Sequence, residues 1–525
     1  NSFRASLKTM KIPIFLTSVS ILLASAKVQA SPNFVFILAD DMGYGDVSHA
    51  GGKIPTPNLD KLRADGMRFT DAHTTSSVCT PTRYGILTGR YNWRSRLKKG
   101  VLFPPDISIM DPVRKTIAGF LKDRGYRTCV VGKWHLGLNW HMLQTPAKAT
   151  TGPTKGTCWN IDFARPPQQG PLKLGFTEDF LFPASLDMAP YLYLRDDRVT
   201  VMPTVSKGWN RQGPATPDFE AKNCLIDFAR ESRAFIEDAV SSSSPFFLYL
   251  PLTSPHTPIV PSKKWQGRSP LGHYGDFVME TDWVVGQIMQ ELTEQKVAED
   301  TVLIFTTDNG CSPAAGIPKL VSQGHKPNGD WRGHKADIYE GGHRVPFLVR
   351  WPARVSAGSS CNLTVCTTDY FATVADILGA RGRKFPQNAA EDSFSFLAAL
   401  GNPDLQTPTR PYTIHHSING SFAIRKGPWK LCLCPGSGGW SSPRPAKALK
   451  DKSLPPIQLF HLANDPAETT NLQAEFPEVV EDLVADLHHA IQAGRSNSGP
   501  PRSNEGWPKT FPQAVLKLFP QLAGK

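Results

Sequence analysis

The chain has 525 residues, of which 40% are hydrophobic and 20% are charged. These proportions are ordinary for a globular protein and exclude a disordered or fibrous chain, and the length allows one large domain with a smaller second one. The formal net charge of +12 at pH 7 favours polyanionic partners. We expect no nucleic-acid partner, because no motif combines basic and aromatic residues in the manner of a nucleic-acid-binding site. An ordinary solvated surface is the alternative explanation of the charge.

The first 30 residues are predicted to be a secretory signal peptide. A basic start precedes an apolar run at 12–26, and the residues at 28–30 suit a cleavage site. The basic residues of the start are Arg4, Lys8 and Lys11. The apolar run is too short for a membrane span. We therefore expect a mature chain that begins near Ser31, has no stable membrane anchor, and is exported to the periplasm, the extracellular space or the lumen of the secretory pathway. A buried N-terminal helix is the alternative.

Four apolar runs are predicted to be buried strands, and each ends in polar residues. The runs cover residues 33–39, 128–131, 246–250 and 301–305. Helical patterns lie between them at 58–66, 112–124, 223–239 and 274–294. This alternation predicts an α/β fold with a large, mostly parallel sheet sandwiched by helices. Ligands of such sheets bind beyond the carboxyl ends of the strands, so we expect the polar residues that follow the runs to form one site.

Oxygen-bearing side chains follow two of these runs. Asp40 and Asp41 come directly after the first run, and Asp308 and Asn309 follow the fourth. Either pair alone is typical of a turn. Together they offer the ligands that a hard divalent cation prefers, which favours Ca²⁺ or Mg²⁺ over Zn²⁺.

The segment 79–90 reads Cys-Thr-Pro-Thr-Arg-Tyr-Gly-Ile-Leu-Thr-Gly-Arg and is predicted to begin a helix. Pro81 suits the first turn, and Thr80 or Thr82 could cap the helix. A nucleophilic Cys79 beside Arg83 at a helix N-terminus suits an anionic ligand. A buried structural cysteine is the alternative interpretation.

The Cys-x-Pro-x-Arg spacing with its Thr-Gly-Arg ending resembles the signature of the sulfatase family. The resemblance implies that a maturation enzyme oxidises Cys79 to formylglycine (3-oxoalanine), whose hydrated aldehyde attacks the sulfur of a sulfate ester. It also implies that Asp40, Asp41, Asp308 and Asn309, together with the modified Cys79, bind a metal ion, usually Ca²⁺ and in some cases Mg²⁺.

Three further segments are similar to sulfatase motifs, namely Gly-Lys-Trp-His-Leu-Gly at 132–137, Ser-Pro-His-Thr-Pro at 254–258 and Arg-Gly-His-Lys at 332–335. The resemblance implies that Lys133 and Lys335 bind sulfate oxygens together with Arg83. It places His135 at the aldehyde hydrate as a base. It places His256 near the leaving oxygen, where His256 is our candidate general acid, alone or with Lys335.

These residues predict an exported sulfatase that hydrolyses sulfate monoesters, with a sulfated carbohydrate as the expected substrate. Related enzymes with the same nucleophile and metal arrangement leave a phosphonate or phosphodiester hydrolase as one alternative. A catalytically silent glycan-binding homologue is a second. The Pro-, Gly- and Thr-rich residues 138–225 match the family only loosely, and we expect them to shape the substrate pocket.

The C-terminal part is predicted to be a small second domain. We expect the catalytic domain at 31–385, an α+β domain of antiparallel sheet plus helix at 386–493, and a flexible tail at 494–525. Short strand candidates lie at 412–415, 421–425, 429–433 and 458–461, followed by a helix at 477–493. Besides Cys79 the chain has eight cysteines, an even number that permits disulfides in an exported protein. No cysteine or histidine spacing matches a zinc site, and His334 and His343 receive no role.

Overall fold

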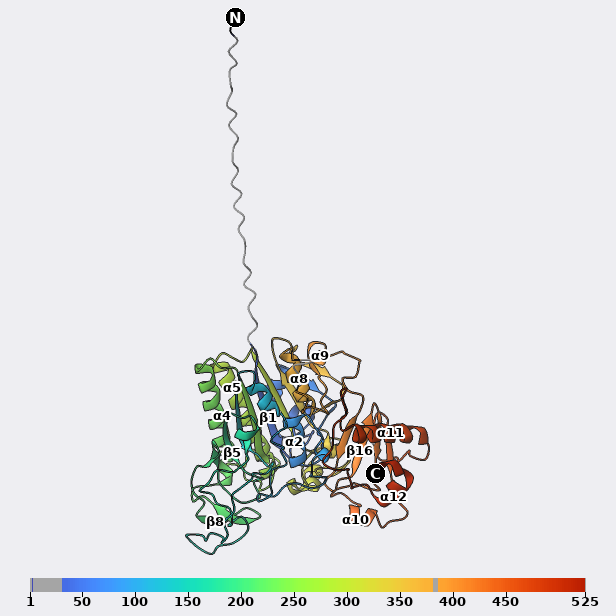
Figure 1. The fold of residues 1–525 in the computed structure, drawn as a ribbon, viewed down its shortest axis with the longest axis horizontal. Helices are drawn as coiled ribbons and strands as arrows, with labels where there is room; N and C mark the ends of the chain where they lie inside the picture. Colours follow the sequence, from blue (N-terminus) through green and yellow to red (C-terminus); the bar gives the residue numbers. More distant parts are fainter. Residues whose placement is uncertain (1, 3–30, 381–385, 525) are drawn as a thin grey trace. The chain divides into compact units, whose positions relative to one another are not determined.

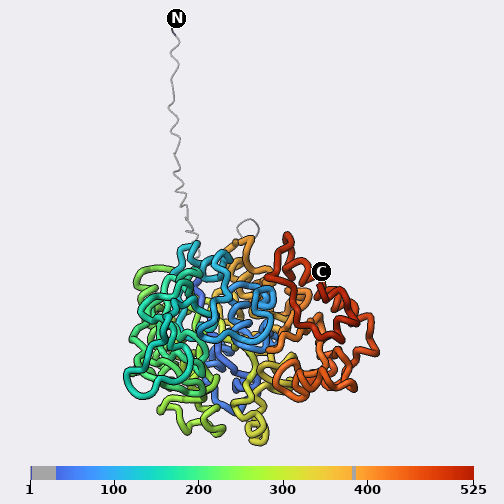
Figure 2. The backbone as a smooth tube through the Cα atoms, turned by 60° about the horizontal axis from the view of Figure 1, so that its bottom comes forward, coloured from blue at the N-terminus to red at the C-terminus, as the bar shows by residue number. Residues whose placement is uncertain are grey.

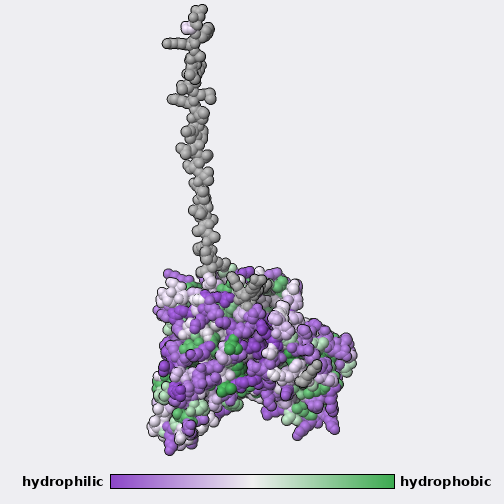
Figure 3. All heavy atoms as spheres, viewed as in Figure 1, coloured by the Kyte–Doolittle hydropathy of each residue, from purple (hydrophilic) through white to green (hydrophobic). Residues whose placement is uncertain are grey.

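The computed structural model describes residue 2, residues 31–380 and residues 386–524. The predicted signal peptide lies almost entirely outside these residues. The chain from Pro32 onwards forms one compact unit. Within the described part, no helix has the length and apolar character that crossing a membrane requires. In the view of Figure 3, hydrophilic residues cover most of the visible face, and hydrophobic residues form small patches.

A ten-stranded sheet forms the centre of this unit, in the order β13-β2-β12-β11-β1-β10-β4-β5-β6-β7. Its five central strands, from β11 to β5, are parallel. They are β1 (Asn33–Asp40), β4 (Arg127–Lys133), β5 (Glu178–Phe182), β10 (Phe246–Pro255) and β11 (Thr301–Thr307). The shorter outer strands are β2 (Met67–Phe69), β12 (Phe347–Arg350), β13 (Ser359–Cys361), β6 (Leu194–Arg195) and β7 (Arg198–Val199). The four predicted strands are therefore neighbours in the middle of the sheet.

Helices cover both faces of the sheet because the central strands are apolar on both sides. All eight residues of β1 are buried. Phe34 and its alternate neighbours pack with α2 (Cys79–Thr88), α3 (Ile117–Lys122), α8 (Asp369–Ile377) and α9 (Leu397–Gly401). Val35 and its alternate neighbours pack with α1 (Pro57–Ala64), α4 (Cys224–Ser241) and α5 (Gly272–Glu294). Figure 1 shows α4 and α5 on one side of β1 and α8 and α9 on the other. The predicted α/β fold is confirmed.

A small antiparallel sheet follows near the C-terminus, as predicted. It runs in the order β15 (Thr413–His416), β16 (Phe422–Lys426), β17 (Trp429–Cys432) and β18 (Gln458–His461). Helix α11 (Pro477–Ala493) packs its apolar face against this sheet. Figure 2 shows this orange and red part of the chain gathered beside the rest of the unit. Two-stranded pairs are formed by β8 (Val205–Gly208) with β9 (Gln212–Ala215), and by β3 (Ala72–His73) with β14 (Val365–Cys366).

The structure differs from the sequence-based expectation in two places. Residues 494–524 are not a free tail, since they include α12 (Gln513–Leu518) and a 3₁₀ turn (Pro520–Ala523). Phe511, Val515 and Leu522 are buried against α11, because they supply apolar contacts that the polar stretch before them lacks. All nine cysteines are free and buried, so the disulfides that their number permits do not form.

Candidate active site

The predicted site residues meet at the carboxyl edge of the central strands. The ends of β11, β1, β10 and β4 are consecutive along that edge, so four separate segments reach one place. These segments carry Asp308 and Asn309, Asp40 and Asp41, His256, and Lys133 with His135. All of them are buried, as are Arg83 and Lys335. The strand order explains why residues so distant in the sequence come together.

Helix α2 presents Cys79 to this edge from its first residue. The Cys79 side chain is 3% exposed, and its burial raises the pKa of the thiol. The prediction that a threonine caps this helix is wrong. The Thr80 hydroxyl donates instead to the His135 carbonyl oxygen at 3.0 Å, and the Thr82 hydroxyl donates to the Ser76 carbonyl oxygen at 3.0 Å. Both hydroxyls therefore hold the neighbouring loops against the start of the helix.

Three basic side chains each contact one carboxylate of the site. The nitrogen–oxygen distances are 2.6 Å for Lys133–Asp40, 2.7 Å for Lys335–Asp41 and 2.8 Å for Arg83–Asp308. Three positive and three negative groups give this cluster a formal charge of zero without a ligand. A divalent cation and a singly charged sulfate ester could therefore enter together without leaving a large net charge.

The two carboxyl groups nearest Arg83 differ in their proton affinity. Burial alone would raise the pKa of Asp40, but Lys133, His256 and Arg83 hold it well below its usual range. The pKa of Asp308 rises to about 7, because its burial and the nearby Asp40 carboxylate outweigh Arg83. A carboxyl group that is costly to ionise beside another carboxylate indicates a place where additional positive charge would be favourable.

Unpartnered oxygens in the same cluster fit a hard cation. Asp40 Oδ1 and Asn309 Oδ1 are buried and have no hydrogen-bond partner among the described residues. Ligand atoms of Asp40, Cys79 and Asp308 lie within 4.8 Å of one another, and Asn309 Nδ2 donates to Asp41 Oδ1 at 2.7 Å. Buried oxygens without a partner are costly, so their convergence indicates a ligand. The donor set of carboxylate and amide oxygens suits Ca²⁺ or Mg²⁺.

One ring nitrogen of His135 carries a lone pair. Its Nε2 donates to the Leu102 carbonyl oxygen at 2.9 Å, so the lone pair is on Nδ1, which has no hydrogen-bond partner in the part of the chain that the structure describes. Burial, with Lys133 and Arg83 nearby, holds the pKa of His135 well below its ordinary value. The imidazole is therefore neutral at physiological pH and can accept a proton at Nδ1.

His256 is connected to the Lys133 ammonium group through the Ser185 hydroxyl. Its Nδ1 donates to the Thr257 carbonyl oxygen, which leaves Nε2 toward the site, 3.6 Å from Asp41 Oδ2. The Ser185 hydroxyl lies 3.4 Å from that Nε2 and accepts from Lys133 Nζ at 3.1 Å. No motif in the sequence identifies Ser185, which follows β5 in a loop.

A sulfatase family model matches residues 32–380 of the chain. The chain belongs to the sulfatase family. It is accordingly a sulfuric ester hydrolase. An N-acetylgalactosamine-6-O-sulfatase of Bacteroides thetaiotaomicron is 32% identical over 506 residues, which span 86% of this chain and 91% of that protein. Arylsulfatase A of Homo sapiens is 33% identical over 496 residues, which span 90% of this chain and 92% of that protein.

Solved structures agree with this assignment. One solved structure comes from work on the metabolism of multiple glycosaminoglycans by Bacteroides thetaiotaomicron. It is 30% identical to this chain with a TM-score of 0.73, and the match covers 88% of this chain and 99% of that chain. A phosphonate monoester hydrolase of Agrobacterium radiobacter shares the fold alone, at 18% identity and a TM-score of 0.55, covering 87% of this chain and 94% of that chain.

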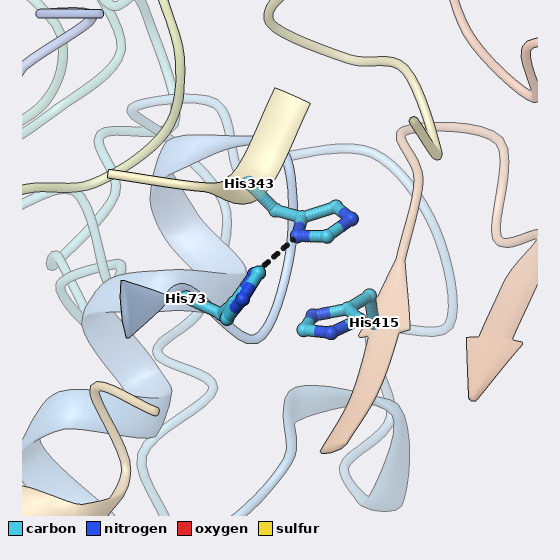
Figure 4. A group of neighbouring side chains, drawn as sticks. All are labelled: His73, His343 and His415. Atoms are coloured by element: carbon cyan, nitrogen blue, oxygen red, sulfur yellow. Dashed lines mark hydrogen bonds between the residues drawn. The ribbon is translucent and has the colours of Figure 1, made fainter. Parts of the chain in front are cut away.

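This sulfatase also contains a buried histidine cluster that the sequence analysis missed. His73, His343 and His415 lie together although they are far apart in the chain (Figure 4), with His73 Nδ1 3.1 Å from His343 Nδ1. The His343 and His415 rings stack with centroids 3.8 Å apart. Lys430 Nζ lies 3.1 Å from His343 Nε2, and His415 Nδ1 donates to the Thr74 carbonyl oxygen. One ring nitrogen of each histidine lies within 4.8 Å of the others, but the ring nitrogens already have hydrogen-bond partners, so we assign no metal ion to this cluster.

The cluster belongs to a set of contacts that hold the loop before Cys79. The backbone oxygen of His416 accepts from the Ser76 hydroxyl at 2.8 Å and from Ser77 N at 3.1 Å. The Ser77 oxygen in turn accepts from Ala336 N at 2.8 Å. The small C-terminal sheet therefore helps to fix the segment that presents Cys79.

Proposed function

We propose that this sulfatase is an exported enzyme that hydrolyses a sulfate monoester of a carbohydrate, with formylglycine formed from Cys79 as its nucleophile. The observation that carries the proposal is the convergence of three buried cations and three buried carboxylates at the first residue of α2. The name of the bacterial relative, an N-acetylgalactosamine-6-O-sulfatase, supports a sugar sulfate as the substrate. The basic start and cleavage pattern of residues 1–30 support export.

Asp40, Asp41, Asp308 and Asn309 would hold a calcium ion, together with the modified side chain of residue 79. Mg²⁺ is the alternative ion for the same oxygen ligands. The unpartnered oxygens of Asp40 and Asn309 support this assignment. A divalent cation bound there would offset negative charge on the sulfate oxygens.

Arg83, Lys133 and Lys335 would bind the sulfate group. Each of these cations pairs with a carboxylate in the structure. A bound divalent cation would neutralise these carboxylates, and the three cations could then donate to sulfate oxygens. A hydrated formylglycine would supply the nucleophilic hydroxyl and a second hydroxyl, whose deprotonation would break the C–O bond to the bound sulfate, release sulfate and return the aldehyde. Nδ1 of His135 would take that proton; the lone pair on this nitrogen, which has no partner among the described residues, supports this role. His256 in its protonated imidazolium form would give the proton on Nε2 to the leaving alcohol, alone or with Lys335.

The deciding experiment combines mass spectrometry with two substrates. We would express the full chain with a formylglycine-generating enzyme, measure the mass of the Cys79 peptide, and assay 4-nitrophenyl sulfate and N-acetylgalactosamine 6-sulfate with and without calcium. We expect a mass about 18 Da below that of the cysteine peptide, and hydrolysis that depends on the metal. Cys79→Ala should be inactive. Turnover by Cys79→Ala, or by protein with unmodified Cys79, would overturn the proposed chemistry.

A further inference from the structure

Three side chains lie beside the candidate active site and have no role in the chemistry described so far. They are Phe103, Asp187 and Arg211. Arg211 lies in the turn between β8 and β9, and its Nη1 contacts Asp187 Oδ2. Its guanidinium carbon is 5.8 Å from the centroid of the Phe103 ring. The Phe103 side chain is 49% exposed, and that of Arg211 is 48% exposed, so both are accessible to a ligand.

This trio connects to both histidines of the site. Asp187 lies two residues after Ser185, whose hydroxyl contacts Lys133 and His256. Phe103 directly follows Leu102, whose carbonyl oxygen accepts from His135. The trio therefore adjoins residues that contact Lys133, His135 and His256.

The chemistry of the trio suits a sugar ring. Although burial alone would raise it, the pKa of Asp187 is lowered by His256 and Arg211, so the carboxylate is ionised. Its Oδ1 is buried and has no hydrogen-bond partner within residues 31–380 and 386–524. A carboxylate with a free oxygen accepts from a hydroxyl, a guanidinium donates to one, and an aromatic ring packs against the apolar face of a pyranose.

We propose that Phe103, Asp187 and Arg211 bind the pyranose ring that carries the sulfate, and that they favour sugar sulfates over aryl and steryl sulfates. The inference deepens the proposed function and rests on it. An aryl or steryl sulfate lacks hydroxyls beside the ester, so it would leave Asp187 Oδ1 without a hydrogen bond and would accept none from Arg211.

The experiment compares two substrates in three variants, Asp187→Asn, Arg211→Ala and Phe103→Ala. We expect Asp187→Asn and Arg211→Ala to lower kcat/KM for N-acetylgalactosamine 6-sulfate by at least about 10-fold more than kcat/KM for 4-nitrophenyl sulfate, and Phe103→Ala to lower both, because an aromatic ring packs against either substrate. Arg198→Ala is the matched control, because Arg198 is an exposed arginine at the far edge of the sheet on β7. Equal losses on both substrates from Asp187→Asn and Arg211→Ala, or no loss from any variant, would overturn the proposal.

A binding measurement separates this proposal from the proposed chemistry. We would titrate N-acetylgalactosamine 6-sulfate into Cys79→Ala protein and into the same protein with Arg211→Ala, by calorimetry. Arg211 is half-exposed, so its removal should leave the melting temperature unchanged. We expect the second protein to bind the sugar sulfate at least about 10-fold more weakly. Equal affinities would contradict the sugar-binding role, whereas a wild-type enzyme without turnover would contradict only the formylglycine chemistry.

Discussion

Replacing His135 by glutamine tests the proposed base with the least disturbance of the fold. Glutamine keeps an amide N–H that can donate to the Leu102 carbonyl oxygen, as Nε2 of His135 does at 2.9 Å. It does not supply the basic nitrogen that His135 offers at the unpartnered Nδ1. The substitution therefore removes the basic atom and retains the hydrogen bond.

The magnitude follows from these two atoms. A positioned base contributes a factor of about 10²–10⁴ in rate, or about 2.7–5.4 kcal/mol of barrier, so we expect kcat to fall by that factor. With the bond to Leu102 retained, the free energy of unfolding should change by less than about 1 kcal/mol. His135→Ala leaves that buried carbonyl without a donor, so it should also lower the free energy of unfolding by about 1–3 kcal/mol.

The assay is steady-state hydrolysis of 4-nitrophenyl sulfate at matched metal content and matched modification of Cys79, with the melting temperature measured in parallel. Because burial and Lys133 hold the pKa of His135 well below its ordinary value, the loss in kcat should be the same at pH 6 and pH 8. His273→Gln, at an exposed histidine of α5, is the matched control. The reasoning fails if His135→Gln retains kcat within about 3-fold at an unchanged melting temperature.

Three further predictions concern charge. Chelation of divalent metal should lower both the melting temperature and the activity, and calcium should restore both, because the buried oxygens of Asp40 and Asn309 would lose the ion that satisfies them. Arg83→Met should destabilise the metal-free protein by about 1–3 kcal/mol in denaturant titrations, since the buried Asp308 carboxyl loses the guanidinium that lies 2.8 Å away and lowers its pKa, and added calcium should reduce that loss. Lys430→Met should lower the free energy of unfolding by about 3–5 kcal/mol at pH 8. The reason is that Lys430 Nζ lies between two buried carboxylates, 3.1 Å from Glu340 Oε1 and 2.8 Å from Glu468 Oε1. Lys430 lowers the pKa of both groups, and the pKa of Glu468 is already raised to about 7 by its burial. Without Lys430 the folded protein binds a proton that the unfolded chain releases. The loss in the free energy of unfolding should therefore be smaller at pH 6 than at pH 8. A larger loss at pH 6 would contradict this account.

The sequence predicts the part of the site that follows from strand ends. The four apolar runs are local signals, and parallel strands present their carboxyl ends at one edge, so the pattern alone is enough to bring Asp40, His256 and Asp308 together. Lys335 could be placed only by family resemblance, since it comes from a loop with no periodic pattern.

Side chains whose roles depend on tertiary contacts could not be predicted. Thr80 and Thr82 have the composition of helix caps, but loops packed against α2 take both hydroxyls. Ser185 and Arg211 lie in loops, where no spacing rule links them to a strand end. The burial of Val515 depends on a surface supplied by α11, which the polar stretch at 494–510 does not reveal.

The contact between the C-terminal sheet and the loop before Cys79 limits when Cys79 can be modified. The residue that accepts the Ser76 hydroxyl lies 340 positions further along the chain, so this closure forms only after most of the protein has been synthesised. Once it has formed, Cys79 is 3% exposed and no separate enzyme can reach its thiol. The proposed oxidation must therefore take place on the emerging or still unfolded chain. A molecule that folds before Cys79 is oxidised stays inactive. The active fraction of a preparation therefore depends on the rate of folding relative to the rate of modification.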